Sequence, residues 1–257
     1  MNSFLEERKD LAAAYQWCER CGFHEGVDNH LSVMVSTSPP RFLINPRGRH
    51  WSRMTPEALL VIDERGNTID GDGEALRTGP TIHVAIHQIH PSAKVVLHTH
   101  MPYATALTAI KGGELRQVHQ NSVRFLDQCA YDRTFNGLAL DMNEGKRLAE
   151  AMGEKRVLFM AHHGVIVVGS NVAEALDDLY YLERACEIQC LAASMQNEEL
   201  QEISPEVAKQ TAAQFRNRSA SAKLHLEEVK RILNLDCLGV YLASFLALGN
   251  QSFVDHD

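Results

Sequence analysis

The stretch VVLHTH at residues 95–100 is typical of a buried β-strand that ends in two histidines separated by one residue. Side chains at positions i and i+2 of a strand point to the same face, so His98 and His100 can converge on one point. A second apolar stretch, VLFM at residues 157–160, runs directly into AHHG at residues 161–164. An imidazole from this second stretch would complete a set of three histidines with one open position, as in a catalytic zinc-type site.

The second stretch offers two histidines, and a regular strand would point them to opposite faces. Only one of His162 and His163 can therefore join the first pair. Gly164 follows His163 directly, and a glycine permits the close approach of another backbone segment. We therefore expect His163 to be the third ligand.

The remaining histidines of the 13 in the chain show weaker patterns. His83 and His87 lie four residues apart on a predicted helix, in the sequence HVAIH. This sequence lacks the glutamate that metalloprotease chemistry requires at the second position of its motif. We interpret the pair as partly exposed helix histidines. No pattern involves the histidines at 24, 50, 225 and 256.

The apolar periodicity along the chain predicts short strands mixed with helices. Helices are expected over residues 4–21, 80–90, 103–110, 143–152, 172–193 and 206–234, and strands over 31–35, 41–45, 58–63, 68–69, 95–100 and 157–163. The stretch 164–169 is either the continuation or the return of the last strand. Hairpins without regular βαβ alternation predict an α/β/α sandwich on a central mixed, largely antiparallel sheet.

The chain is expected to divide into a metal-binding domain over residues 1–196 and a C-terminal helical extension over 197–257. The stretch 197–210 is polar and predicts a linker. The apolar stretch 238–248 predicts a docked tail or a subunit contact.

Composition excludes several classes of partner. The net charge of −8 argues against nucleic acid, which requires clustered Lys and Arg. No apolar run reaches the roughly 18–20 residues that a membrane span needs, and the N-terminal residues do not read as a secretory signal. Six cysteines are too few for a disulfide scaffold, and CxxC at residues 18–21 has no second pair. We expect a cytoplasmic protein that acts on a small molecule.

From about residue 8 to 195 the chain resembles the class II aldolase/adducin superfamily. The matching landmarks are HLS at residues 30–32, FLINPRG at 42–48, PSAKVVLHTH at 91–100 and AHHGV at 161–165. The resemblance implies an α/β/α fold, commonly a homotetramer, and a divalent metal held by three histidines near a subunit interface. Carried across, the ligands are His98, His100 and His163. The metal would usually be zinc, although imidazole also suits manganese, iron and cobalt.

The chain departs from the sugar-phosphate aldolases of this superfamily at three places. Their acid/base glutamate corresponds to Gly79, which can neither ligate nor transfer a proton, and Glu74 lies five residues away. Their Gly-Asn phosphate cradle corresponds to Asn29-His30, and a tyrosine after the metal strand corresponds to Gln120. The metal site is therefore kept while the sugar-phosphate apparatus is lost.

This pattern resembles the adducin-like bacterial branch, which includes decarboxylases of hydroxylated aromatic dicarboxylic acids. We therefore expect a metal-dependent carbon–carbon lyase, of aldolase or decarboxylase type, on a small non-phosphorylated carbonyl compound or hydroxy-aromatic acid. Metal would stabilise the enolate-like product of bond cleavage in either reaction. His119 and His162 are the candidates for proton transfer. The candidates for substrate binding are His30, Arg47, Arg77, Thr78 and Gln120.

Two alternatives remain on the same scaffold. The first is a non-catalytic adducin-like interaction module. Adducin head domains generally lack the three metal histidines, so their presence here favours an enzyme, as does the lack of a long basic tail. The second is a sugar-phosphate aldolase or epimerase, which the lost phosphate cradle disfavours.

Overall fold

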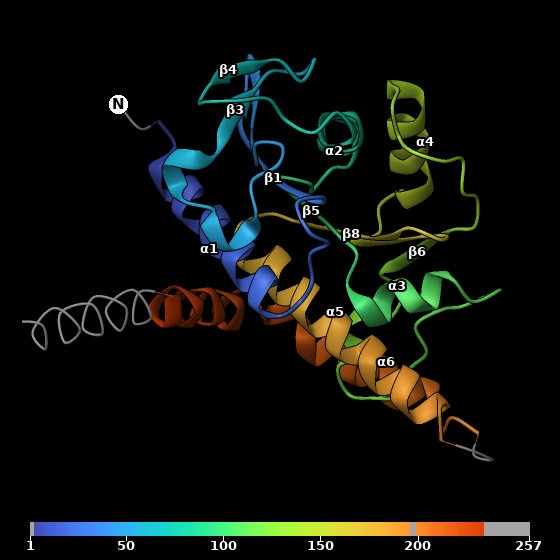
Figure 1. The fold of residues 1–257 in the computed structure, drawn as a ribbon. Helices are drawn as coiled ribbons and strands as arrows, with labels where there is room; N and C mark the ends of the chain where they lie inside the picture. Colours follow the sequence, from blue (N-terminus) through green and yellow to red (C-terminus); the bar gives the residue numbers. More distant parts are fainter. Residues whose placement is uncertain (1–2, 196–198, 234–257) are drawn as a thin grey trace, which may run out of the picture.

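The computed structural model describes residues 3–195 and 199–233 of the 257-residue chain. These residues form one eight-stranded sheet with the strand order β4-β3-β2-β1-β5-β8-β7-β6 and with helices on both faces (Figure 1). Neighbouring strands are antiparallel except β6 and β7, which are parallel. The predicted α/β/α sandwich with a mixed, largely antiparallel sheet is therefore confirmed.

The strands match the apolar stretches of the sequence, with one addition. They are β1 (His30–Thr37), β2 (Pro40–Ile44), β3 (Leu60–Ile62), β4 (Thr68–Asp70), β5 (Val95–Thr99), β6 (Cys129–Asp132), β7 (Val157–Met160) and β8 (Gly164–Gly169). The edge strand β6 was not predicted. The stretch 164–169 is a return, because β7 and β8 form an antiparallel hairpin through the tight turn at residues 161–163.

Alternate residues of the strands pack against helices on opposite faces of the sheet. Val95 and Leu97 join the core formed with α1 (Leu5–Arg20) and α5 (Val172–Ala193), whereas Val96 packs with α2 (Thr78–Ile89) and α4 (Met142–Met152). The short helix α3 (Pro102–Thr108) follows β5 on the α5 side. His98 alternates with Leu97, so its side chain belongs to the α2 face.

The C-terminal segment packs on the α1 and α5 side of the sheet. It contains α6 (Pro205–Gln214), a 3-10 turn (Phe215–Asn217) and a helical stretch over residues 219–233. The predicted single helix over 206–234 is therefore interrupted. Ala222, Leu226 and Val229 are buried in the main core. The division at residue 196 stays a prediction, and the apolar stretch 238–248 lies outside the described residues.

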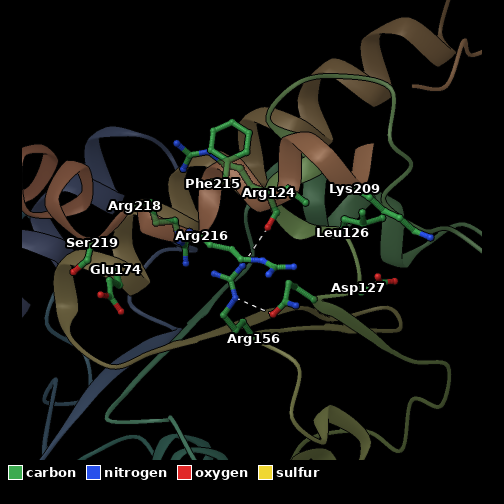
Figure 2. A pocket seen from close by; sticks show the side chains of 12 residues that line it. Arg124, Leu126, Asp127, Arg156, Glu174, Lys209, Phe215, Arg216, Arg218 and Ser219 are labelled. Atoms are coloured by element: carbon green, nitrogen blue, oxygen red, sulfur yellow. Dashed lines mark hydrogen bonds between the residues drawn. The ribbon is translucent and has the colours of Figure 1, made fainter. Parts of the chain in front are cut away.

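A cluster of arginines joins this segment to the body of the protein. Arg124 binds the buried Asp177 at 2.9 Å, and both Arg156 and Arg218 bind the buried Asp178. These arginines line a hollow of about 620 Å³, shown in Figure 2. Because buried carboxylates on α5 hold all three guanidinium groups, we interpret the cluster as a structural junction. The break at residues 215–218 brings Arg218 to this junction.

Among the residues that the structure describes, no helix combines the length and the apolar character needed to cross a membrane.

Candidate metal centre

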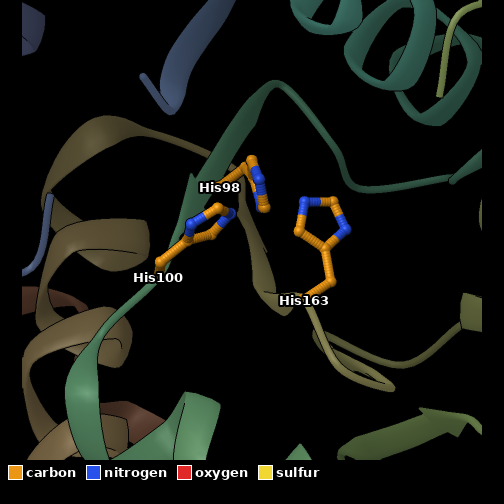
Figure 3. A group of neighbouring side chains, drawn as sticks. All are labelled: His98, His100 and His163. Atoms are coloured by element: carbon orange, nitrogen blue, oxygen red, sulfur yellow. The ribbon is translucent and has the colours of Figure 1, made fainter. Parts of the chain in front are cut away.

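The structure brings together the three histidines that the sequence selects. His98 lies on β5, His100 follows one residue after that strand ends, and His163 lies in the β7–β8 turn. Figure 3 shows the rings facing one another. Their ring centroids are 4.8–5.0 Å apart, and one nitrogen from each ring lies within 4.8 Å of the others. The three residues form what we call the histidine cluster.

A backbone hydrogen bond orients His98. Its Nδ1 lies 3.0 Å from the carbonyl oxygen of Val165 on β8. A carbonyl can only accept, so Nδ1 carries the proton and Nε2 of the neutral ring keeps its lone pair. Burial, together with the neighbouring imidazoles, lowers the pKa of His98 well below its ordinary value. His98 is therefore held in the neutral form that a metal ligand must have.

A carboxylate orients His100. Nδ1 of His100 lies 2.5 Å from Oε2 of Glu25, in the loop after α1, and Nε2 is buried without a partner. A carboxylate on the far nitrogen of a ligand histidine fixes the ring and raises its basicity. The sequence gives no sign of this role, because a single loop glutamate joins His100 only through the fold.

The β7–β8 turn brings His163 to the cluster only because glycine follows it. A Cβ atom at Gly164 would lie 2.5 Å from the carbonyl oxygen of Thr99 and 2.8 Å from Cδ2 of His100. Real Cβ atoms do not approach so closely, so any side chain at this position would push the two histidine segments apart. Burial and the adjacent imidazole of His100 lower the pKa of His163 to about 4, which keeps this ring neutral as well.

The donor set fits a divalent cation. Nδ1 of His98 and Nδ1 of His100 each bind an oxygen atom. Within the described part of the chain, the three rings make these two hydrogen bonds. The buried and unpartnered Nε2 of His100 requires a partner, because an unsatisfied buried polar atom is costly. Three imidazole nitrogens with an open side suit zinc and related divalent ions.

The two candidates for proton transfer lie apart from the histidine cluster. His162 is exposed with φ 55°, and its ring makes an edge contact with Phe135 at 6.3 Å. His119 lies in a loop where its Nδ1 accepts from the backbone N–H of Asn121. Neither ring makes a described contact with the histidine cluster. Their roles in proton transfer stay predictions.

Two of the five candidates for substrate binding lie beside the cluster. The ring centroids of His30 and His98 are 5.0 Å apart, and Nε2 of His30 lies 3.2 Å from Oγ1 of Thr78. The other three candidates are exposed, namely Arg47, Arg77 and Gln120. Arg77 lines a separate hollow between α2 and α4. The roles assigned to all five stay predictions.

Gly79 makes room for His30. A Cβ atom at position 79 would lie 3.2 Å from Cδ2 and 3.3 Å from Cγ of the His30 ring, and 3.0 Å from Cδ1 of Ile44. The imidazole of His30 therefore fills the space beside the position where the resemblance expects a glutamate.

The sequence interpretation of His83 and His87 as partly exposed is wrong. Their exposed fractions are 1% and 4%, because α2 packs this face against the sheet. Both rings hydrogen-bond to Ser32 on β1, 51 and 55 residues away along the chain. The spacing of histidines on a helix cannot reveal a hydrogen-bond partner that lies so far away along the chain.

A second group of ligand-type side chains lies near the end of α1. Atoms of Glu19, His24 and His50 lie within 4.8 Å of one another. The Nε2 atoms of the two histidines are 3.1 Å apart, and Nδ1 of His50 accepts from the backbone N–H of Ser52 at 3.3 Å. His50 can then donate from Nε2 to His24, so a hydrogen bond accounts for this contact.

Comparisons of sequence agree with these landmarks. The family model described as Class II Aldolase and Adducin N-terminal domain matches residues 9–190. A Caulobacter vibrioides protein named for the class 2 aldolases is 33% identical over 204 residues, which cover 79% of this chain and 78% of that protein. An adducin-related protein of Schizosaccharomyces pombe is 34% identical over 209 residues, covering 76% of this chain and 62% of that protein.

Comparisons of structure agree as well. An aldolase II superfamily protein from Pseudomonas syringae superposes with a TM-score of 0.84 at 31% identity, covering 90% of this chain and 93% of that one. The fold is shared by the L-fuculose 1-phosphate aldolase from Glaciozyma antarctica PI12, with a TM-score of 0.78 at 24% identity over 89% and 88% of the two chains. With its family match over residues 9–190, this chain belongs to the class II aldolase and adducin family.

Proposed function

We propose that this protein is a metal-dependent carbon–carbon lyase that acts on a small non-phosphorylated carbonyl compound or hydroxy-aromatic acid. One observation carries the proposal: three imidazoles converge, and oxygen atoms at Nδ1 of His98 and His100 leave Nε2 of these two rings free. A structural histidine would satisfy both ring nitrogens inside the protein. Zinc is our first choice of metal, with manganese, iron and cobalt as alternatives.

His98, His100 and His163 would hold the ion, which when bound would supply a Lewis acid that draws electron density from the breaking C–C bond toward a substrate oxygen. The chain contributes the orientation of the ligands. Glu25 holds the ring of His100, and the Val165 carbonyl holds that of His98. Burial of His98 strengthens electrostatic interactions with a developing negative charge on its side of the site.

The preference for non-phosphorylated substrates follows from the charge around the cluster. Arg47 and Arg77, the basic candidates for binding an anion, are exposed, and the described contacts of both lie away from the three rings. His30 is buried beside the cluster, and burial lowers its pKa well below the ordinary value, so it supplies no positive charge. A phosphate dianion would find little compensation here.

We further propose a cytoplasmic homotetramer with the site near a subunit interface, where a partner chain can add groups that this chain lacks. The five cysteines that the structure describes are free thiols, which suits a reducing compartment. The alternative of an adducin-like interaction module draws support from the adducin-related relative, and the three histidines favour the enzyme.

The first experiment is elemental mass spectrometry of untagged protein, with His98→Ala as the test variant and His162→Ala as the matched control. We expect about one metal ion per chain in the wild type and the control, and almost none in His98→Ala. Retained metal in His98→Ala would contradict the ligand assignment. No metal in the wild type, even after growth with zinc and manganese, would favour the interaction module.

The metal-loaded protein can then be screened for release of CO₂ from hydroxy-aromatic acids and of aldehydes from non-phosphorylated aldols. Fuculose 1-phosphate serves as the comparison substrate, and its efficient turnover would contradict the proposed substrate class.

A further inference from the structure

A chain of buried hydrogen bonds runs from His30, beside the histidine cluster, to the far end of α2. Nδ1 of His30 lies 2.8 Å from Nε2 of His83, whose Nδ1 lies 2.5 Å from Oγ of Ser32. The same oxygen lies 2.8 Å from Nε2 of His87, whose Nδ1 lies 2.6 Å from the carbonyl oxygen of Ala93. All four side chains are buried. We call this set the buried relay.

The direction of every hydrogen bond in the buried relay follows from the Ala93 carbonyl. A carbonyl accepts only, so Nδ1 of His87 carries a proton and its Nε2 carries a lone pair. Ser32 must then donate its one hydroxyl proton to His87. Its oxygen is left to accept from His83, whose Nδ1 is therefore protonated.

The direction of the hydrogen bond at His83 also fixes the protonation of His30, beside the histidine cluster. With Nδ1 of His83 protonated, its Nε2 is an acceptor, so Nδ1 of His30 must donate to it. Nε2 of His30 then carries a lone pair, toward which the hydroxyl of Thr78 donates at 3.2 Å. The opposite arrangement fails at Ser32, because one hydroxyl proton cannot serve lone pairs on both His83 and His87.

The neutral state of the rings supports this chain of directions. Burial lowers the pKa of His87 to about 4 and lowers that of His83 well below the ordinary value. His30 is 2% exposed, and its hydrogen-bond partners His83 and Thr78 supply no negative charge to stabilise a cation. Each ring therefore carries a single proton near neutral pH, as the hydrogen-bond directions require.

We propose that the buried relay fixes His30 as a hydrogen-bond acceptor on the wall of the metal centre, so that the substrate group beside it is a hydroxyl. This inference rests on the proposed function, because it takes the substrate to bind at the histidine cluster. His30 is then a specificity-determining residue, while Ser32, His83 and His87 are positioning residues.

The proposal revises the role that the sequence suggests for His30. An anionic carboxylate or phosphate would face the lone pair of Nε2 and be repelled, whereas a hydroxyl would donate to it. The Thr78 hydroxyl meets this single lone pair at 3.2 Å, so a substrate hydroxyl would take its place as the donor. The ring lies beside His98, so the substrate hydroxyl would be a neighbour of the oxygen that binds the metal.

Neutron diffraction of deuterium-exchanged wild-type crystals tests the acceptor directly and requires no activity. We expect deuterium on Nδ1 of His30, His83 and His87 and none on their Nε2 atoms. Deuterium on Nε2 of His30 would overturn the proposal.

Solid-state ¹⁵N NMR of histidine-labelled protein tests the positioning role. Ser32→Ala removes the hydroxyl that forces the direction, so we expect a population of His30 protonated on Nε2 to appear. Ser122→Ala is the matched control, because Ser122 is also fully buried but donates to the carbonyl of His119. An unchanged His30 signal in a folded Ser32→Ala variant would show that the relay does not position this ring.

Calorimetry with two metal-chelating probes tests the substrate preference. Glycolohydroxamate carries a hydroxyl next to the chelating group, and acetohydroxamate lacks it. We expect the metal-loaded wild type to bind the former about tenfold more tightly, as one added hydrogen bond allows. This ratio should fall toward one in Ser32→Ala and stay at the wild-type value in Ser122→Ala.

The outcomes separate the two proposals. Equal binding of both probes to the wild type would overturn the hydroxyl preference while leaving the metal site intact. If neither probe binds, the proposed metal function fails, and the neutron result alone decides whether His30 is an acceptor.

Discussion

Two groups of three histidines lie side by side on the same face of the sheet and differ in how their ring nitrogens are satisfied. In the buried relay, the hydrogen bonds of His30, His83 and His87 involve both nitrogens of each ring. In the histidine cluster, the hydrogen bonds described for the rings use only the two Nδ1 atoms of His98 and His100. The first group is satisfied within the protein, with the Thr78 hydroxyl on His30 in the place proposed for a substrate hydroxyl, and the second is open toward a common centre.

This difference, rather than sequence spacing, is the basis on which we propose the ligand set. His83 and His87 have the i, i+4 spacing of a helical metal pair, yet a serine between their nitrogens satisfies both rings. His98 and His100 lie two residues apart, and a carbonyl and a carboxylate orient them from outside. Removal of a residue from each group should therefore have opposite consequences for metal binding and for folding.

The largest expected effect is on metal affinity. His100→Ala should weaken zinc binding by about a thousandfold, because four-ligand zinc sites gain about 10–16 kcal/mol and one of three protein ligands is lost. His87→Asn should keep zinc at wild-type stoichiometry, since the ring lies in the buried relay. Competition with a chromophoric chelator measures both affinities. Loss of zinc from a folded His87→Asn variant would break the distinction between the groups.

The next effect is on stability at acid pH. His87 has a folded-state pKa of about 4 against about 6.5 when unfolded, so the unfolded state binds more protons between these values. The contribution of neutral His87 to the free energy of unfolding is therefore complete above pH 6.5. It falls by about 3 kcal/mol as the pH decreases to 4. His30 and His83 act in the same direction.

Urea unfolding of the metal-free protein at several pH values measures this loss. His87→Leu should show a shallower decline than the wild type, whereas His162→Gln, a substitution of an exposed histidine, should follow it. A wild-type stability that stays constant from pH 7 to 4 would show that the relay histidines titrate normally.

A smaller effect is expected at the carboxylate that orients His100. Glu25→Gln keeps the size of the side chain but removes its charge, and loss of such an outer partner typically costs about 10–100-fold in metal affinity. Zinc affinity is again the measurement, with Glu19→Gln on the neighbouring helix as the control. Equal affinities of Glu25→Gln and wild type would remove Glu25 from the site.

The smallest effect is expected at Gly79. Gly79→Ala should change the free energy of unfolding by less than about 1 kcal/mol, since the gain in helix propensity of about 1 kcal/mol offsets the tight contact with His30. Thermal unfolding measures the change. A loss of several kcal/mol would mean that the imidazole cannot move aside, which would sharpen the view of the relay as rigid.

Apolar periodicity predicted most of this fold, because buried strands and amphipathic helices carry strong patterns. The edge strand β6 has the sequence CAYD and is mostly half-buried, so it lacks both alternation and an apolar run. The interruption near Arg218 depends on a buried carboxylate on another helix. Such long-range contacts leave no local pattern.

The candidate site also contains residues that the local sequence predicts and residues that only long-range contacts bring together. Convergence of His98, His100 and His163 followed from strand geometry, from a glycine and from the family resemblance. Glu25 was missed because its loop meets His100 only in three dimensions. Arg77 was chosen for its charge near a motif, but the start of α2 turns it toward a different hollow.

The close approach of Gly79 to His30 couples the two positions. A side chain at position 79 would place its Cβ 3.2 Å from the His30 ring and 3.0 Å from Ile44, so an acid there would have to displace the imidazole by a few tenths of an ångström. Because the hydrogen bonds of the buried relay hold that imidazole, the side chain at position 79 also sets how precisely His30 is placed. Engineering of a carboxylate at position 79 should therefore be designed together with position 30.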